Sequence, residues 1–112
     1  MQINVAEHLV RMIVVTPEGR IDAFSAPTLR ERLEQFLEEG VSKFVLDLTD
    51  VSFLDSAGMA VLVSLLKKTR QKGGDVKLIL PSEEAAQRIL RLTRFDKVFD
   101  IADSSEAALE KF

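Results

Sequence analysis

The chain has 112 residues, 46% of them hydrophobic, and a formal net charge of −3 with acids and bases interspersed. This length fits a single compact domain over residues 1–112 with enough apolar material for a core. The charge pattern offers no broad basic surface for nucleic acid or anionic lipid. The lack of cysteine excludes disulfides, thiol catalysis and cysteine metal sites, and the single histidine, His8, disfavours a histidine-based metal site or triad. We therefore expect no metal site, and no residue of the sequence indicates a cofactor.

The first 15 residues do not resemble a targeting or membrane segment. Their apolar run is interrupted by Glu7, His8 and Arg11, and it has no basic leader or small-residue cleavage site. No other stretch approaches the ~18 uninterrupted apolar residues that a membrane-spanning helix needs. The sequence therefore predicts a soluble, cytoplasmic protein without a membrane partner.

Two short strands are expected at the start of the chain. Ile3 and Val5 alternate with polar neighbours, as in a half-exposed strand, and residues 9–15 form a nearly continuous branched apolar run. These two segments could form an antiparallel hairpin. The "TPEG" stretch at 16–19 predicts a turn after the second strand.

The period then changes to that of a helix over residues 25–40. Ser25 can cap its start, Pro27 suits its first turn and Gly40 suits its end. Four apolar residues fall on one face of this helix, opposite a charged face: Leu29, Leu33, Phe36 and Leu37.

The next pair of elements is a strand over residues 43–48 and a helix that begins near Ser56. The strand is apolar on both faces, as expected when a sheet is covered on both sides. The helix continues to the "KKTRQKGG" stretch at 67–74, where cations complement the helix dipole and glycines end the helix.

The remaining chain repeats this alternation. Residues 76–80 predict a strand that Pro81 ends, and Ser82 predicts the start of a third helix. Residues 97–101 suit a last short strand. Asp103 with Glu106 resembles a capping box at the start of a closing helix.

This order of elements predicts an α/β domain with a mostly parallel central sheet, an N-terminal antiparallel hairpin and about four helices. Functional groups in such sheets gather at the carboxyl ends of the strands. Two stretches qualify, "GRIDAFS" at 19–25 and "TDVSFLDSAG" at 49–58.

The position of Ser56 at the start of its helix allows two interpretations. In the first, Ser56 or Asp55 is simply the N-cap, which stabilises the helix by about 1 kcal/mol. In the second, the Ser56 hydroxyl is a phosphorylation site, because the positive end of the helix favours a phosphoryl group. The small residues Ala57 and Gly58 would let a partner's active site come close.

A phosphoryl group at this position would add about −1.5 to −2 charge units to a loop that already holds acids. Asp50 and Asp55 belong to this loop, and Asp22 is expected nearby across the strand ends. The helix dipole offsets this repulsion only in part. We therefore expect phosphorylation to repel or block a partner with little refolding of the domain.

Three other chemistries fit the sequence less well. A serine nucleophile needs a base and a G-x-S-x-G turn, and the only histidine lies near the N-terminus. The glycine and lysine spacing of a phosphate-binding P-loop is missing. Asp47 or Asp50 could be a response-regulator phosphoacceptor, but the first strands offer no adjacent acidic pair before Asp22 to bind Mg²⁺.

Other charged and aromatic residues suit ordinary roles. Arg88, Arg91 and Arg94 recur every three residues on the third predicted helix, which favours a solvated face over a surface for an acidic partner. The seven phenylalanines are expected in the core. Other residues predicted on the inner side of the second helix are Met59, Leu62, Leu65 and Leu66.

Three stretches together resemble the STAS domain, and specifically the stand-alone anti-sigma factor antagonists of bacteria. They are "GRIDAFSAPTLRERLEQFL", "KFVLDLTDVSFLDSAGMAVLVSLLKK" and "GGDVKLIL". The most specific part is D-S-x-G-x-x-x-L, from Asp55 to Leu62. The likeness runs from the second strand to the final helix.

The resemblance implies a regulatory, non-enzymatic mechanism. The unmodified protein would bind an anti-sigma factor, often a serine kinase, and so free a sigma factor for transcription. The kinase would then phosphorylate Ser56 and be released, and a PP2C-type phosphatase would restore the protein. Ser56 matches the phosphoacceptor of the family, and Asp55, Gly58 and Asp22 match other motif positions. We expect a partner surface around them made of Asp22, Asp55, Ser56, Ala57, Gly58 and Met59.

The chain departs from the family pattern at three positions, and a second role within the same fold stays open. Ala57, Ala60 and Arg20 stand where many members carry a hydroxyl residue, a glycine and an acid. The identity and docking of the kinase are therefore not fixed by the motif. The alternative role is a subunit of a lipid-transport ATPase complex or a stress-signalling scaffold, and the pattern does not fix an oligomeric state.

Overall fold

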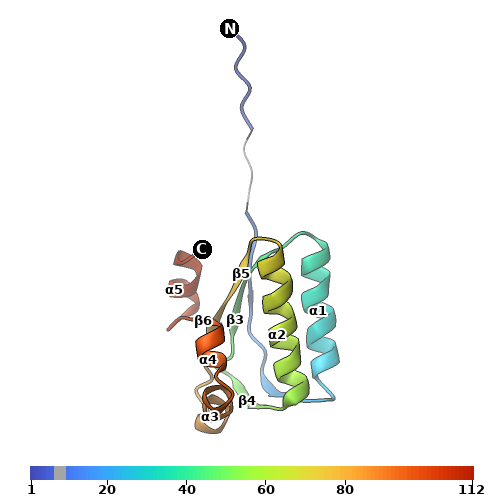
Figure 1. Ribbon diagram of the computed structural model, residues 1–112, viewed down its shortest axis with the longest axis vertical. Coiled ribbons are helices and arrows are strands. Elements are labelled where there is room, and N and C mark those ends of the chain that lie inside the picture. Colours follow the sequence, from blue (N-terminus) through green and yellow to red (C-terminus); the bar gives the residue numbers. More distant parts are fainter. Residues whose placement is uncertain (7–9) are drawn as a thin grey trace.

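A four-stranded parallel sheet forms the centre of the computed structural model, which describes residues 1–6 and 10–112 (Figure 1). Two further strands form a separate parallel pair, with Ile21 opposite Leu54. The strands of the central sheet, in spatial order, are β1 (Met12–Val15), β3 (Lys43–Asp47), β5 (Asp75–Ile79) and β6 (Asp100–Ile101). Those of the second sheet are β2 (Gly19–Ile21) and β4 (Val51–Leu54).

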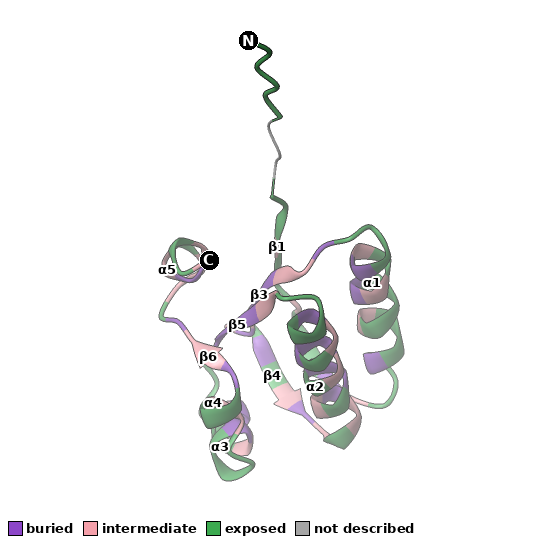
Figure 2. Cartoon of the chain, turned by 45° about the horizontal axis from the view of Figure 1, so that its top comes forward, coloured by how far each residue is buried: buried purple, intermediate pink, exposed green. Residues whose placement is uncertain are grey.

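Helices cover both faces of the central sheet. They are α1 (Ala26–Glu38), α2 (Ser56–Gln71), α3 (Glu84–Leu92), α4 (Phe95–Val98) and α5 (Ser105–Glu110). Figure 2 shows α1 and α2 side by side on one face and α5 on the other. Helix α3 packs against β4. No helix within residues 1–6 and 10–112 is long and apolar enough to cross a membrane.

The alternation of side chains along the central strands divides the core into two layers. Phe44 and Leu46 belong to the larger cluster, together with the inner residues of α1 and α2. Val45 and Ile79 belong to a second cluster with Ala108 of α5. The prediction that residues 43–48 form a strand covered on both faces is confirmed, because all three middle residues of β3 are fully buried.

The expected N-terminal hairpin is corrected by the structure. Ile3 and Val5 are 75% and 88% exposed and lie outside any strand, in a segment that points away from the sheet (Figure 1). Strand β1 pairs with β3 in parallel register instead. Two alternating residues offer too little apolar surface to specify a strand, whereas Ile13 and Val15 of β1 pack on the core. His8 and Leu9 lie outside the described residues.

The second half of the chain follows the predicted order with shifted boundaries. Helix α3 begins at Glu84 rather than at Ser82. Arg94 lies beyond its end in the left-handed conformation, with φ of 61°, so it does not continue the helical face of the other two arginines. The expected strand 97–101 is reduced to β6, because its first two residues belong to α4.

The closing helix is capped by a different residue from the one predicted. The Ser104 hydroxyl accepts the Ala107 amide at 3.1 Å, so Ser104 and not Asp103 is the N-cap. With α4, the described residues contain five helices rather than about four.

Candidate functional site

The two stretches singled out in the sequence meet at one end of the small sheet, after the last residues of β2 and β4. We call the surface formed there by residues 22–24, Asp55 and Ser56 the Ser56 edge. Strands β2 and β4 are parallel, and Ile21 lies opposite Leu54. Asp22 and Asp55 are the next residues of each strand, so both follow the same end of the pair. The Asp55 amide also donates to the Ile21 carbonyl at 3.3 Å. The predicted proximity of Asp22 to the Ser56 helix is confirmed.

The Asp55 carboxylate fixes the start of α2 and the loop after β2 at the same time. Its Oδ1 accepts the Gly58 amide at 3.0 Å, which makes Asp55 the N-cap of α2. Its Oδ2 accepts the Ala23 amide at 3.1 Å. Of the two capping residues left open by the sequence, the structure therefore selects Asp55.

Ser56 is the first residue of α2 and is exposed. Because Asp55 provides the cap, the Ser56 hydroxyl is not needed to hold the helix start. Helix α2 has 16 residues, and its amino-terminal end carries partial positive charge. The position thus combines an accessible hydroxyl with a local field that favours an attached anion.

The loop from Asp22 to Ser25 is held by a compact set of hydrogen bonds. Asp22 Oδ1 accepts the amides of Phe24 and Ser25 at 3.0 and 3.1 Å. The Ser25 hydroxyl accepts the Asp22 amide and donates to the Arg20 carbonyl at 2.7 Å. Ser25 therefore occupies the N-cap position of α1 without the predicted side-chain cap, because its hydroxyl is used inside the loop.

The same hydrogen bonds lower the pKa of Asp22 below its ordinary value. The Ser25 amide has the largest effect, and it outweighs the partial burial that acts in the opposite direction. The Phe24 amide and the Arg20 guanidinium, 3.5 Å from Oδ2, add to the lowering. Asp22 is thus a fixed negative charge of the Ser56 edge at neutral pH.

Gly58 has a different role from the predicted partner contact. It is buried, and a Cβ atom on it would lie 2.4 Å from the carbonyl oxygen of Ile21. The glycine thus lets α2 approach the end of β2 rather than giving a partner access. Ala57 and Met59 are half-buried and pack against the core cluster, so they are less exposed than Ser56.

Asp50 and Asp47 are not part of this edge. Asp50 precedes β4, and its carbonyl accepts the amide of Gly19 at 2.9 Å, at the opposite end of the β2–β4 pair from Ser56. The expectation that Asp50 adds charge near Ser56 is therefore wrong. Asp47 ends β3, where its carboxylate accepts hydrogen bonds from Thr49 and Ser105. The acidic cluster of a response regulator is not assembled in the described residues.

Phe24 is the residue of this edge that the sequence patterns missed. It is 94% exposed, so the prediction that all phenylalanines are core residues is wrong for it. Its position in a loop, outside the periodic apolar segments, was the available signal. Nearby, the Arg20 guanidinium stacks over the Phe53 ring at 4.1 Å from the ring centroid.

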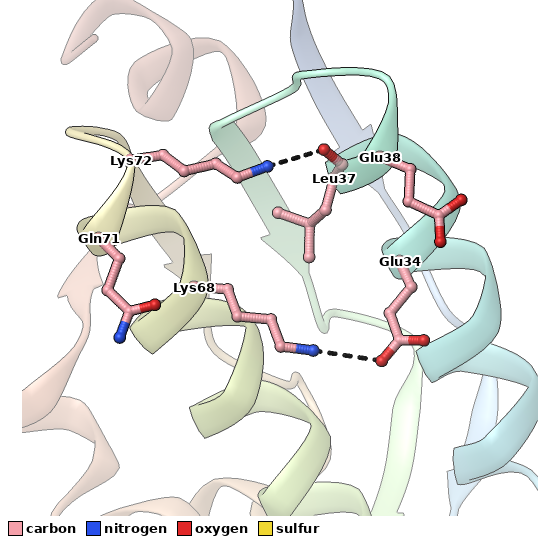
Figure 3. A pocket seen from close by; sticks show the side chains of 6 residues that line it. All are labelled: Glu34, Leu37, Glu38, Lys68, Gln71 and Lys72. Carbon is pink, nitrogen blue, oxygen red and sulfur yellow. Dashed lines mark hydrogen bonds and ion pairs between the residues drawn. The ribbon is translucent and has the colours of Figure 1, made fainter.

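A hollow of about 410 Å³ lies between the last turns of α1 and α2, away from this edge (Figure 3). The Lys68 ammonium donates a hydrogen bond to the Glu34 carboxylate across the hollow at 3.2 Å, and the Lys72 ammonium donates to the Leu37 carbonyl at 2.8 Å. Its two lysines are thus already engaged by α1. The α2 residues that line the hollow, Lys68, Gln71 and Lys72, lie at the end of that helix opposite Ser56, so the Ser56 edge is a separate surface.

Comparison with known proteins identifies the family. The model of the STAS domain matches residues 3–108. The anti-sigma-B factor antagonist of Bacillus subtilis is 37% identical over 101 residues, which is 88% of each chain. That of Listeria monocytogenes is 33% identical over 104 residues, 92% of this chain and 87% of its own.

Solved structures agree with this assignment. An anti-sigma factor antagonist from Mycobacterium paratuberculosis superposes with a TM-score of 0.77 at 28% identity, covering 88% of this chain and 84% of its own. SpoIIAA shares the fold in its unphosphorylated form, at a TM-score of 0.69, 20% identity and coverage of 89% and 87%. Its phosphorylated form gives a TM-score of 0.69, 19% identity and coverage of 94% and 95%. The chain therefore belongs to the STAS domain family, among relatives that are anti-sigma factor antagonists.

Proposed function

We propose that this protein is an anti-sigma factor antagonist controlled by phosphorylation of Ser56. The unmodified Ser56 edge would bind an anti-sigma factor with serine kinase activity, and the phosphorylated edge would release it. The main support is the geometry at the start of α2. Asp55 caps the helix, and the exposed Ser56 hydroxyl is free for another role.

The charges around Ser56 give a physical reason for the direction of this switch. A phosphoryl group adds about −1.5 to −2 charge units. Asp22 and Asp55 follow the paired ends of β2 and β4 and are held by backbone amides, so they cannot easily turn away. The helix end offsets part of the new charge by about 0.3–1 kcal/mol. The modification would therefore change the surface presented to a partner much more than the fold.

The remaining parts of the proposal follow from this mechanism. The protein would act by binding, without catalysis of its own, and a PP2C-type phosphatase would remove the phosphoryl group. Its place of action would be the cytoplasm, where transcription is controlled. The names of the antagonist relatives support the choice of an anti-sigma factor as the partner.

The test is phosphorylation by the serine-kinase anti-sigma factors encoded in the same genome. Each kinase is incubated with the protein and ATP, and the peptide that contains residue 56 is analysed by mass spectrometry. We expect one phosphoryl group on Ser56, none on Ser56→Ala, and normal modification of Ser52→Ala, a variant at another exposed serine four residues earlier. Modification of Ser56→Ala to the same extent, or no modification by any of these kinases, would contradict the proposal.

A further inference from the structure

Phe24 leaves a large apolar ring in solvent, on the loop that Asp55 joins to the start of α2. At 94% exposure it is the most exposed large hydrophobic residue in the range 10–112, where Leu92 follows at 73%. The other six phenylalanines of the chain are buried or half-buried. Single apolar residues on a surface are common, so the exposure acquires meaning only from the way in which this ring is presented.

The backbone that carries the ring is fixed on both sides. The Phe24 amide donates to the Asp22 carboxylate at 3.0 Å. The preceding amide, of Ala23, donates to the Asp55 carboxylate at 3.1 Å, and the Ala26 amide donates to the Asp22 carbonyl at 2.7 Å. A side chain on such a preorganised loop loses little backbone entropy when it is bound.

The loop that carries the ring also has a defined position relative to the start of α2. Asp55, the residue before Ser56, accepts the amide of the residue before Phe24. The loop of the ring and the phosphoacceptor thus belong to one edge, where Asp55 and Asp22 supply negative charge that the Arg20 guanidinium, 3.5 Å from Asp22, offsets only in part. An apolar anchor bordered by acids is complementary to an apolar pocket bordered by basic side chains.

We propose that Phe24 is the anchor by which this protein docks on its anti-sigma factor, in an apolar pocket with a basic rim next to the kinase active site. This inference rests on the proposed function and adds the residue that holds the partner. Phosphorylation of Ser56 adds negative charge to the surface that faces the partner when the ring is bound. Phosphorylation therefore weakens docking.

Calorimetric titration of the kinase that modifies Ser56 tests the anchor. We expect Phe24→Ala to raise the Kd at least tenfold and Phe24→Leu to raise it less, while both variants keep the melting temperature of the wild type because the ring makes no core contact. Leu92→Ala, which truncates another exposed apolar residue on α3, should change the Kd by less than twofold. In phosphorylation kinetics, Phe24→Ala should raise KM and leave kcat nearly unchanged.

The outcomes separate this inference from the proposed function. If the kinase binds the wild type and releases it after phosphorylation, but binds Phe24→Ala within twofold as well, the anchor is wrong and the proposed function stands. If no anti-sigma factor binds the wild type, both are wrong. Self-association of the wild type that Phe24→Ala abolishes would assign the ring to a second copy of the chain and would also overturn the anchor.

Discussion

Ala23 donates its amide to the Asp55 carboxylate at 3.1 Å, joining residues that are 32 positions apart in the sequence. The other oxygen of the same carboxylate caps α2 through the amide of Gly58. One side chain therefore sets both the start of the helix that carries Ser56 and the loop that carries Phe24. The Asp55 carboxylate is therefore one of the contacts that set the placement of these two residues relative to each other.

Asp55→Ala should lower both stability and partner binding. The loss of the helix cap costs about 1 kcal/mol and the loss of the loop hydrogen bond about another 1 kcal/mol. Urea unfolding should therefore show a decrease of about 2 kcal/mol in the free energy of unfolding. Binding to the anti-sigma factor should weaken as well, because the loop is no longer held against the helix.

Ser104→Ala is the matched control for Asp55→Ala. Ser104 caps α5 through a similar bond of 3.1 Å, but α5 lies on the opposite face of the sheet (Figure 2). This variant should lose about 1 kcal/mol of stability with unchanged binding. Weakened binding in the control, to the same degree as in Asp55→Ala, would show that binding follows global stability rather than the geometry of the edge.

Gly58→Ala should destabilise the protein, against the usual effect of alanine in a helix. Alanine normally stabilises a helix interior by about 1 kcal/mol relative to glycine. Here the new Cβ would lie 2.4 Å from the Ile21 carbonyl oxygen, so α2 must move away from β2. We expect a net loss of about 1–3 kcal/mol by denaturant unfolding. Ala60→Gly, at an exposed position of α2, measures the propensity effect alone, and a more stable Gly58→Ala would contradict the close approach.

A second charged cluster, around Lys77, should make stability depend on pH at both extremes. Lys77 is only 7% exposed, and its ammonium lies 2.8 Å from Asp100 and 3.2 Å from Asp75. Burial lowers the pKa of Lys77, but hydrogen bonds to the two acids outweigh it and raise the pKa above 10.5. The hydrogen bond from Lys77 is the main cause that lowers the pKa of Asp100 below 3.8.

The directions of the pKa shifts of Asp100 and Lys77 determine how the free energy of unfolding should depend on pH. The contribution of Asp100 is present above pH 3.8 and is lost as the pH falls through its lower folded pKa. The contribution of Lys77 is present below pH 10.5 and is lost as the pH rises through its higher folded pKa. Urea unfolding should thus give a plateau of stability at intermediate pH. Lys77→Met should lower this plateau by about 1–2 kcal/mol and flatten the alkaline decline; an unchanged alkaline decline would contradict the role of Lys77.

The main helices and central strands were predictable because their patterns are long. The apolar face of residues 29–37 spans more than two turns and predicts α1, and the buried run at 43–48 predicts β3. The start of α2 near Ser56 was also predictable, from the change of period after an acidic and a hydroxyl residue.

The parts that could not be predicted depend on contacts between distant segments. Strands β2 and β4 have three and four residues, too few for a periodic signal, and they are specified by their pairing. Because the strand β4 was not predicted, Asp50 and Asp55 were expected in one loop, and Asp50 was expected close to Ser56. The burial of Gly58 and the exposure of Phe24 likewise follow from how the loop after β2 meets α2, which no local pattern encodes.

The most direct measurement compares the affinity of one anti-sigma factor for the unmodified protein and for the same protein phosphorylated on Ser56. We expect the unmodified protein and Ser56→Ala to bind equally, and the phosphorylated protein and Ser56→Asp to bind at least tenfold more weakly, a difference of about 1.4 kcal/mol or more. Circular dichroism should show the same fold in all four samples. Equal affinity of the unmodified and phosphorylated proteins would contradict control of binding by charge at the start of α2.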